Sequence, residues 1–132
     1  MLDVVSWRIP QKVLYSQFSG TVHLQDLQEM MRIGYEMIDS ESSAEGIHGV
    51  VDVSRCEQYA RDLMNLSAMK ALSRPHPRTG WVIMINPAPH PVMQFISASV
   101  IKLLKVNYAM VKSDTEAMAM LQHVDRGLAT MS

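Results

Sequence analysis

The sequence contains a single cysteine, Cys56, which excludes an internal disulfide bond and a zinc site built from several thiolates. It has no basic run, since its 12 lysines and arginines nearly balance 13 acidic residues, so the electrostatic footprint of nucleic-acid binding is missing. No apolar stretch is long enough to predict a membrane-spanning helix. No glycine-rich phosphate loop or nucleophile elbow occurs. The first residues lack the features of a signal peptide, and we therefore expect a cytoplasmic protein.

The 132 residues suit one compact domain, and an apolar content of 48% is enough for a buried core. We expect a single domain over residues 1–132, with its core at about 4–124 and a frayed tail at 127–132. The 12 methionines have two interpretations. They either fill the core in place of leucine, which is the commoner use, or form an adaptable apolar binding surface.

Two alternating runs at the beginning of the chain predict a β-hairpin around Pro10. The first run covers residues 4–9 and the second covers residues 12–19, with Gly20 expected to end the second strand. Three apolar residues of the first run are expected on one face: Val5, Trp7 and Ile9.

Downstream of the hairpin, helical and strand patterns alternate. Apolar spacing and composition predict helices over residues 24–38, 61–72 and 92–103. A capping box at residues 113–116, Ser-Asp-Thr-Glu, predicts the start of a fourth helix, which carries Ala117, Met118, Leu121 and Val124. Apolar runs predict buried strands over residues 47–53 and 81–85, with a short strand at 107–112 and a polar connection at 54–59. Val51 and Ile83 are expected in the core of neighbouring strands. The predicted fold class is α/β, in the order β-β-α-β-α-β-α-β-α, with a mostly parallel sheet, flanking helices and the hairpin near one edge.

Four segments in this order resemble the STAS domain, the SpoIIAA-like fold of bacterial anti-sigma-factor antagonists. Residues 13–20 match the second strand of that family and its closing glycine. Residues 49–54, Gly-Val-Val-Asp-Val-Ser, match its central strand, and residues 81–85 match the next apolar strand. Residues 107–121 resemble its last strand and a Ser-x-x-Glu helix. The resemblance implies a module that regulates other proteins by binding them.

The chain departs from this family at the phosphorylation site. The antagonists carry Asp-Ser-Ser-Gly-Leu after the central strand, and a partner kinase phosphorylates the first serine. Without gaps, the matching positions in this chain are residues 60–64, and Arg61 replaces that serine. Because arginine has no hydroxyl group, a phosphorylation switch at this position is excluded if the alignment holds.

Polar residues follow the predicted central strand and the next strand along the chain. Function in such sheets usually lies at the carboxyl ends of the strands, and a pocket for a polar or anionic ligand is one interpretation. The commoner interpretation is that Asp52 and Ser54 bond nearby backbone amides. The candidate residues are Asp52, Ser54, Arg55, Tyr59, Arg61, Asn86 and His90.

The predicted helix over residues 61–72 has apolar residues on two sides. Leu63, Leu66 and Met69 would lie opposite the side that packs on the sheet. An exposed patch of this kind predicts a homodimer or a docked protein partner. The alternative is that a loop of the same chain covers the patch.

No other residues predict a specific chemistry. Arg55 next to Cys56 is a weak indication of a lowered thiol pKa, and an ordinary buried cysteine is the commoner case. The five histidines show no metal-ligand spacing, and neither a metal nor a cofactor is expected. The main hypothesis is a non-enzymatic STAS-like interaction module. The alternatives are a small-molecule or lipid carrier related in architecture to SEC14-type folds and, least favoured, an enzyme that uses Asp52 and Arg61.

Overall fold

The computed structural model describes residues 1–41, 46–65, 67, 76–87, 91, 94 and 107–125. Five strands form one sheet in the order β1-β2-β3-β4-β5. β1 is antiparallel to β2, and the other neighbours are parallel. This confirms the predicted α/β class, the mostly parallel sheet and the hairpin at one edge. The elements are β1 (Leu2–Ile9), β2 (Val13–Val22), α1 (Leu24–Asp39), β3 (Ile47–Tyr59), the 3-10 helix η1 (Arg61–Met64), β4 (Thr79–Ile85), β5 (Asn107–Val111) and α4 (Asp114–Val124).

The hairpin turns through Gln11, whose φ of 64° is in the left-handed region. The pairing of β1 with β2 shifts register between Trp7 and Ile9. An extra residue in a strand reverses the alternation of faces beyond it. Trp7 accordingly packs with the cluster that contains Leu14, and Ile9 packs with the cluster that contains Val13. The prediction that Ile9 shares a face with Val5 and Trp7 is therefore wrong.

Two strands, β2 and β3, extend beyond their predicted carboxyl ends. β2 passes through Gly20, which takes a φ of 61° at a second register shift, and ends at Val22. β3 does not stop at Val53 but runs to Tyr59. Its last residues pair with the end of β2, whereas its pairing with β4 ends at Asp52 and Ile85. The segment 54–59, expected as a polar connection, is therefore a strand bonded to β2.

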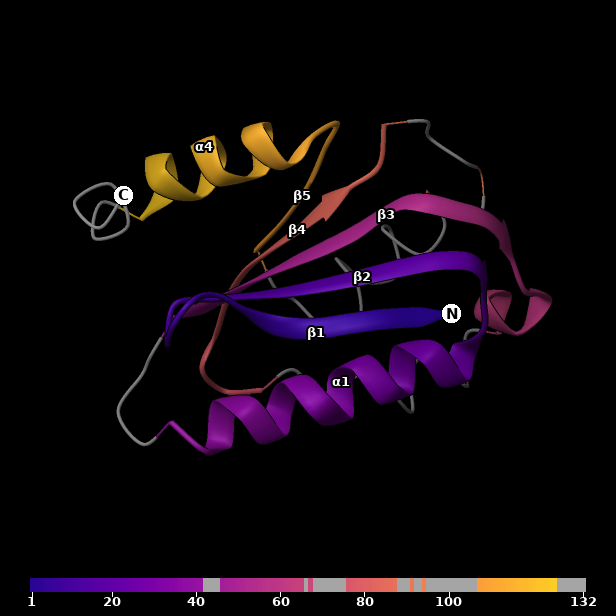
Figure 1. Ribbon diagram of the computed structural model, residues 1–132, viewed down its shortest axis with the longest axis horizontal. Helices are drawn as coiled ribbons and strands as arrows, with labels where there is room; N and C mark the ends of the chain where they lie inside the picture. Colours follow the sequence, from indigo (N-terminus) through magenta and orange to yellow (C-terminus); the bar gives the residue numbers. More distant parts are fainter. Residues whose placement is uncertain are drawn as a thin grey trace.

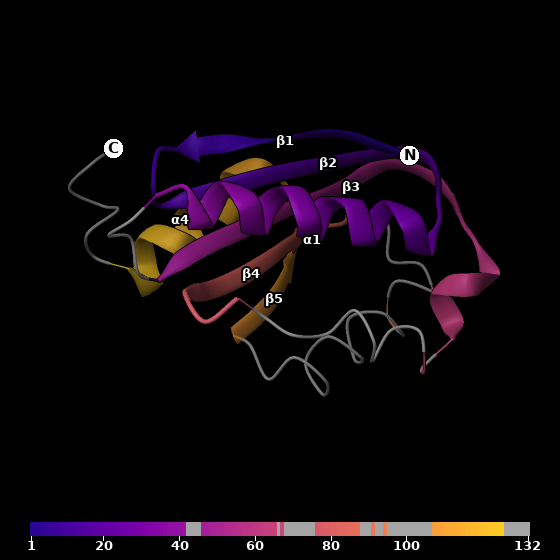
Figure 2. The ribbon, with the colours of Figure 1, turned by 90° about the horizontal axis from the view of Figure 1, so that it is seen from below.

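The two long helices lie on opposite sides of the sheet (Figure 1). Figure 2 shows α1 in front of the sheet, with β1 and β5 at its two edges. On the α1 side, the largest cluster of buried residues comprises Phe18, Val22, Val53, Leu63 and Met84. On the α4 side, the buried cluster comprises Val13, Val50, Ile83, Ile85, Ala117 and Leu121. Strand residues alternate between the two clusters, as expected for a sheet that is covered on both faces.

Ile83 is fully buried, as predicted, and it lies opposite Val50. Val50, with 1% of its surface exposed, is the core residue of β3 on the α4 side of the sheet. Val51 is only half-buried and packs on the α1 side. The prediction of neighbouring strands is confirmed, but the fully buried partner is Val50 rather than Val51.

Helix α4 begins with the predicted cap. The Ser113 hydroxyl accepts the Glu116 N–H at 3.2 Å. The Glu116 carboxylate reaches back one residue further than expected, to the Lys112 N–H at 2.8 Å. Together these side chains satisfy two backbone donors at the helix start, as a capping box does.

The predicted helix over residues 61–72 does not begin as an α-helix. η1 ends at Met64, and the next residue, Asn65, has an extended ψ of 102°. The rest of this prediction, and the helix expected over residues 92–103, lie largely outside the described residues. Among the described helices, none has the length and apolar character required to cross a membrane.

Candidate functional site

Asp52 lies within β3, between Gln17 of β2 and Ile85 of β4. Its Oδ2 accepts the Tyr15 hydroxyl at 2.8 Å, and its Oδ1 accepts the Ser54 N–H at 2.9 Å. The bond to Ser54 is the local contact expected when a strand Asp has a structural role. Both carboxylate oxygens are therefore bonded within the sheet.

Tyr15 is the centre of a contact network that the sequence did not predict. Burial, together with the hydrogen bond to Asp52, raises the pKa of the Tyr15 phenol to about 12. The Arg8 guanidinium lies 4.2 Å from the centre of the Tyr15 ring, a cation–π contact. Arg8 Nη1 also lies 2.6 Å from Asp114 Oδ2. The network joins β1, β2, β3 and the start of α4.

Asn86 follows β4 at the same end of the sheet as Asp52. The two are close in the sheet because Asp52 pairs with Ile85, the residue before Asn86. The Asn86 N–H donates to the Val111 carbonyl at 2.8 Å. Its side chain is buried, with 4% of the residue exposed, and Nδ2 has no hydrogen-bond partner among the residues that the structure describes. A buried amide donor without a partner is uncommon in folded proteins.

The candidate residues of β3 do not gather at one point. Ser54 and Arg55 are exposed along the extension of the strand, and Tyr59 ends it opposite Val22. Tyr59 is seven positions after Asp52, which corresponds to roughly 23 Å at ~3.3 Å per strand residue. Burial and a contact with Cys56 raise the pKa of Tyr59. The prediction of one cluster is therefore wrong for Tyr59, because the strand continues where a turn was expected.

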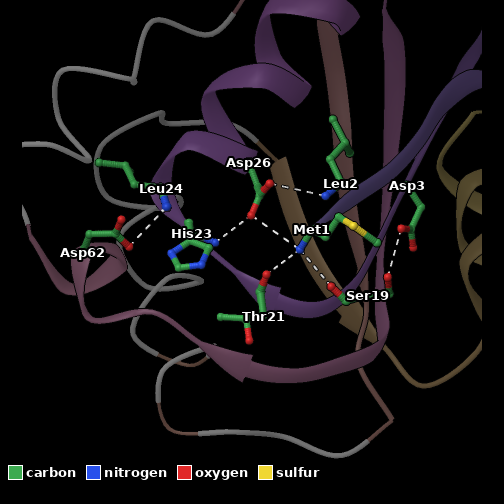
Figure 3. Close-up of polar contacts among 9 residues, drawn as sticks. All are labelled: Met1, Leu2, Asp3, Ser19, Thr21, His23, Leu24, Asp26 and Asp62. Atoms are coloured by element: carbon green, nitrogen blue, oxygen red, sulfur yellow. Dashed lines mark hydrogen bonds and ion pairs between the residues drawn. The ribbon is translucent and has the colours of Figure 1, made fainter.

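The segment after β3 is held in place by three contacts. The Ala60 N–H donates to the Val22 carbonyl at 2.8 Å. Asp62 Oδ1 accepts the Leu24 N–H at 3.2 Å, at the start of α1 (Figure 3). Leu63 is fully buried in the cluster on the α1 side. Arg61 lies in the same turn and is exposed.

The burial of Leu63 makes it wrong to place this residue in an exposed patch. That prediction counted an α-helical period from Arg61, but the 3-10 turn and the extended Asn65 break this period. Leu66 and Met69 lie outside the described residues, and the part of the patch that they would form stays a prediction. His90, a candidate of the polar pocket, also lies outside the described residues.

A second carboxylate, Asp26, joins the start of α1 to the hairpin (Figure 3). It accepts the His23 N–H at 2.8 Å and the Leu2 N–H at 3.4 Å. The Met1 ammonium lies 3.4 Å from it and donates to the Ser19 carbonyl at 2.8 Å. Partial burial favours protonation of Asp26, but the bond from His23 and the charge at Met1 outweigh it, so that its pKa is lowered.

Cys56 lies in β3 and packs against the cluster on the α1 side. Burial raises the pKa of its thiol to about 11, and the smaller effect of the contact with Tyr59 does not reverse this. The raised pKa disfavours a reactive thiolate beside Arg55 and agrees with the commoner interpretation, an ordinary buried cysteine. In the part of the chain that the structure describes, no group of three or more His, Cys, Asp or Glu side chains is placed to hold a metal ion.

No protein-family model matches the sequence, and no curated protein matches it. The fold, however, is similar to a solved structure, that of an uncharacterised protein of the DUF3478 family with a SpoIIAA-like fold from Shewanella loihica PV-4. The two chains are 11% identical, the similarity covers 92% of each, and the TM-score is 0.55. At this level of identity the similarity shows the fold and nothing further. The chain therefore has the SpoIIAA-like α/β fold that its STAS-like segments predict.

Proposed function

We propose that this chain is a non-enzymatic, cytoplasmic STAS-like module that acts by binding a protein partner or a second copy of itself. The SpoIIAA-like fold supports the proposal, together with the way in which the polar side chains near Asp52 are used. Asp52, Tyr15 and Arg8 bond to one another or to neighbouring elements. Such bonding favours a structural role over a catalytic one. Residues 1–132 would form one such module.

Arg61 carries the second part of the proposal, that binding is not controlled by phosphorylation at this position. It is the first residue of η1, directly after β3, where the resemblance matches the phosphorylated serine of the antagonists. The buried Leu63 and the bond from Leu24 to Asp62 anchor this turn. The anchored turn therefore carries an exposed, positively charged guanidinium at this position, and it has no hydroxyl group that a serine kinase could phosphorylate.

Light scattering and identification of captured proteins by mass spectrometry test the binding function. We expect a defined dimer or a stoichiometric complex, and Arg61→Glu should weaken it at least tenfold. Lys12→Glu is a matched charge reversal in the hairpin turn, at the other end of β2, and should leave the complex unchanged. A monomer that captures no partner would contradict the proposal, and equal effects of the two variants would remove Arg61 from the interface.

Incubation with a kinase of the STAS type, followed by phosphopeptide mapping, tests the missing switch. The unmodified chain should take no phosphate at residue 61, and Arg61→Ser should serve as a positive control that restores a hydroxyl. Stoichiometric label on Ser54 or Ser67 of the unmodified chain would show that the alignment with the antagonists is shifted.

The carrier hypothesis predicts a different result from the same purified protein. Native mass spectrometry should detect only the mass of the protein or of its oligomers if the chain is an interaction module. A bound molecule of constant mass would favour a carrier and count against our proposal.

A further inference from the structure

We draw no further inference here: the strongest candidate, the buried Asn86 side chain at the carboxyl end of β4 with its unpartnered Nδ2, is followed by residues 88–90 that lie outside the described part of the chain, so nothing in the structure shows what group would meet it.

Discussion

His48 and Asp125 are 77 residues apart in the sequence, yet Nε2 of the imidazole lies 2.9 Å from Oδ2 of the carboxylate. Nδ1 of the same ring accepts the Trp81 N–H at 2.9 Å. Since Nδ1 acts as the acceptor, the proton of the neutral ring is on Nε2, which donates to Asp125. The buried imidazole therefore joins β3, β4 and the end of α4. It has no free lone pair for general-base catalysis, although a histidine paired with an aspartate is a frequent catalytic arrangement.

The His48 ring leaves no room for a side chain at Gly80 in β4. A Cβ atom added at Gly80 would lie 2.6 Å from His48 Nδ1 and 3.1 Å from the Gly46 carbonyl oxygen. Gly80→Ala should therefore displace the ring and lower the free energy of unfolding by about 1–3 kcal/mol, the usual cost of overpacking. Urea unfolding followed by circular dichroism measures this change.

Gly49→Ala is the matched control, because a Cβ atom added there meets no atom within 4 Å. It should be neutral or raise stability by about 0.4–1 kcal/mol, since alanine reduces the freedom of the unfolded chain. In a His48→Ala background, Gly80→Ala should cost clearly less than in the unmodified protein. An equal cost in both backgrounds would show that the ring is not what excludes a side chain at residue 80.

Tyr15→Phe should remove the hydrogen bond to Asp52 and lower the free energy of unfolding at neutral pH by about 1–2 kcal/mol. The variant should also respond differently to alkaline pH. The Tyr15 pKa rises from 10.0 to about 12 on folding, so its contribution is complete below pH 10 and is lost as the pH rises towards 12. Between these values the unmodified protein should lose more stability than Tyr15→Phe.

Urea unfolding of both proteins at pH 9, 10 and 11 measures this difference. Cys56 and Tyr59 also have raised pKa values, but they are present in both proteins and cancel in the comparison. Parallel stability curves across this range would mean that folding does not raise the pKa of Tyr15.

Cys56 should react slowly while the protein is folded. A rise in its pKa from 9.0 to about 11 leaves roughly one hundredfold less thiolate at pH 8. Alkylation by iodoacetamide at pH 8 should therefore be at least tenfold slower in the native protein than in guanidinium chloride, with Cys56→Ser as the blank. Native alkylation as fast as that of the unfolded chain would indicate an activated thiol, and the raised pKa would be wrong.

Two residues of one turn should respond very differently to truncation. Leu63→Ala removes a fully buried side chain and should lower the free energy of unfolding by about 2–5 kcal/mol. Arg61→Ala removes an exposed one and should stay within about 0.5 kcal/mol of the unmodified protein. A small effect of Leu63→Ala would restore this residue to the surface patch that the sequence predicted.

The sequence predicts the fold well because most core positions lie in strands with clear apolar runs. Residues 47–53 and 81–85 form neighbouring parallel strands as expected, and the Ser113 cap marks the start of α4. The end of β3 was not predicted, because residues 54–59 bond to β2 alone and carry mostly exposed polar side chains. Such a strand has no apolar run to indicate it.

The candidate site was predicted only in part, because its contacts depend on strand register. The alternating pattern put Tyr15 in a strand, and the apolar run put Asp52 in another. Neither pattern shows that the two side chains meet across the sheet, nor that Arg8 bonds to Asp114, 106 residues further along the chain. Leu63 was misplaced for a related reason, since four residues of 3-10 helix carry too little periodicity to show which side is buried.

The contacts at the two ends of α4 have a consequence for how the protein is made on the ribosome. Arg8 can contact Asp114 only after a further 106 residues have been translated. The contact between His48 and Asp125 likewise cannot form until a further 77 residues have been added. Until α4 emerges, the apolar side chains of Val13, Val50 and Ile83 lack Ala117 and Leu121, the described helix residues that are buried with them. A nascent chain without α4 exposes the apolar face of the sheet, which is prone to aggregation. Contacts between residues so distant in sequence also form slowly. The α4 side of the sheet can therefore be completed only after α4 has left the exit tunnel.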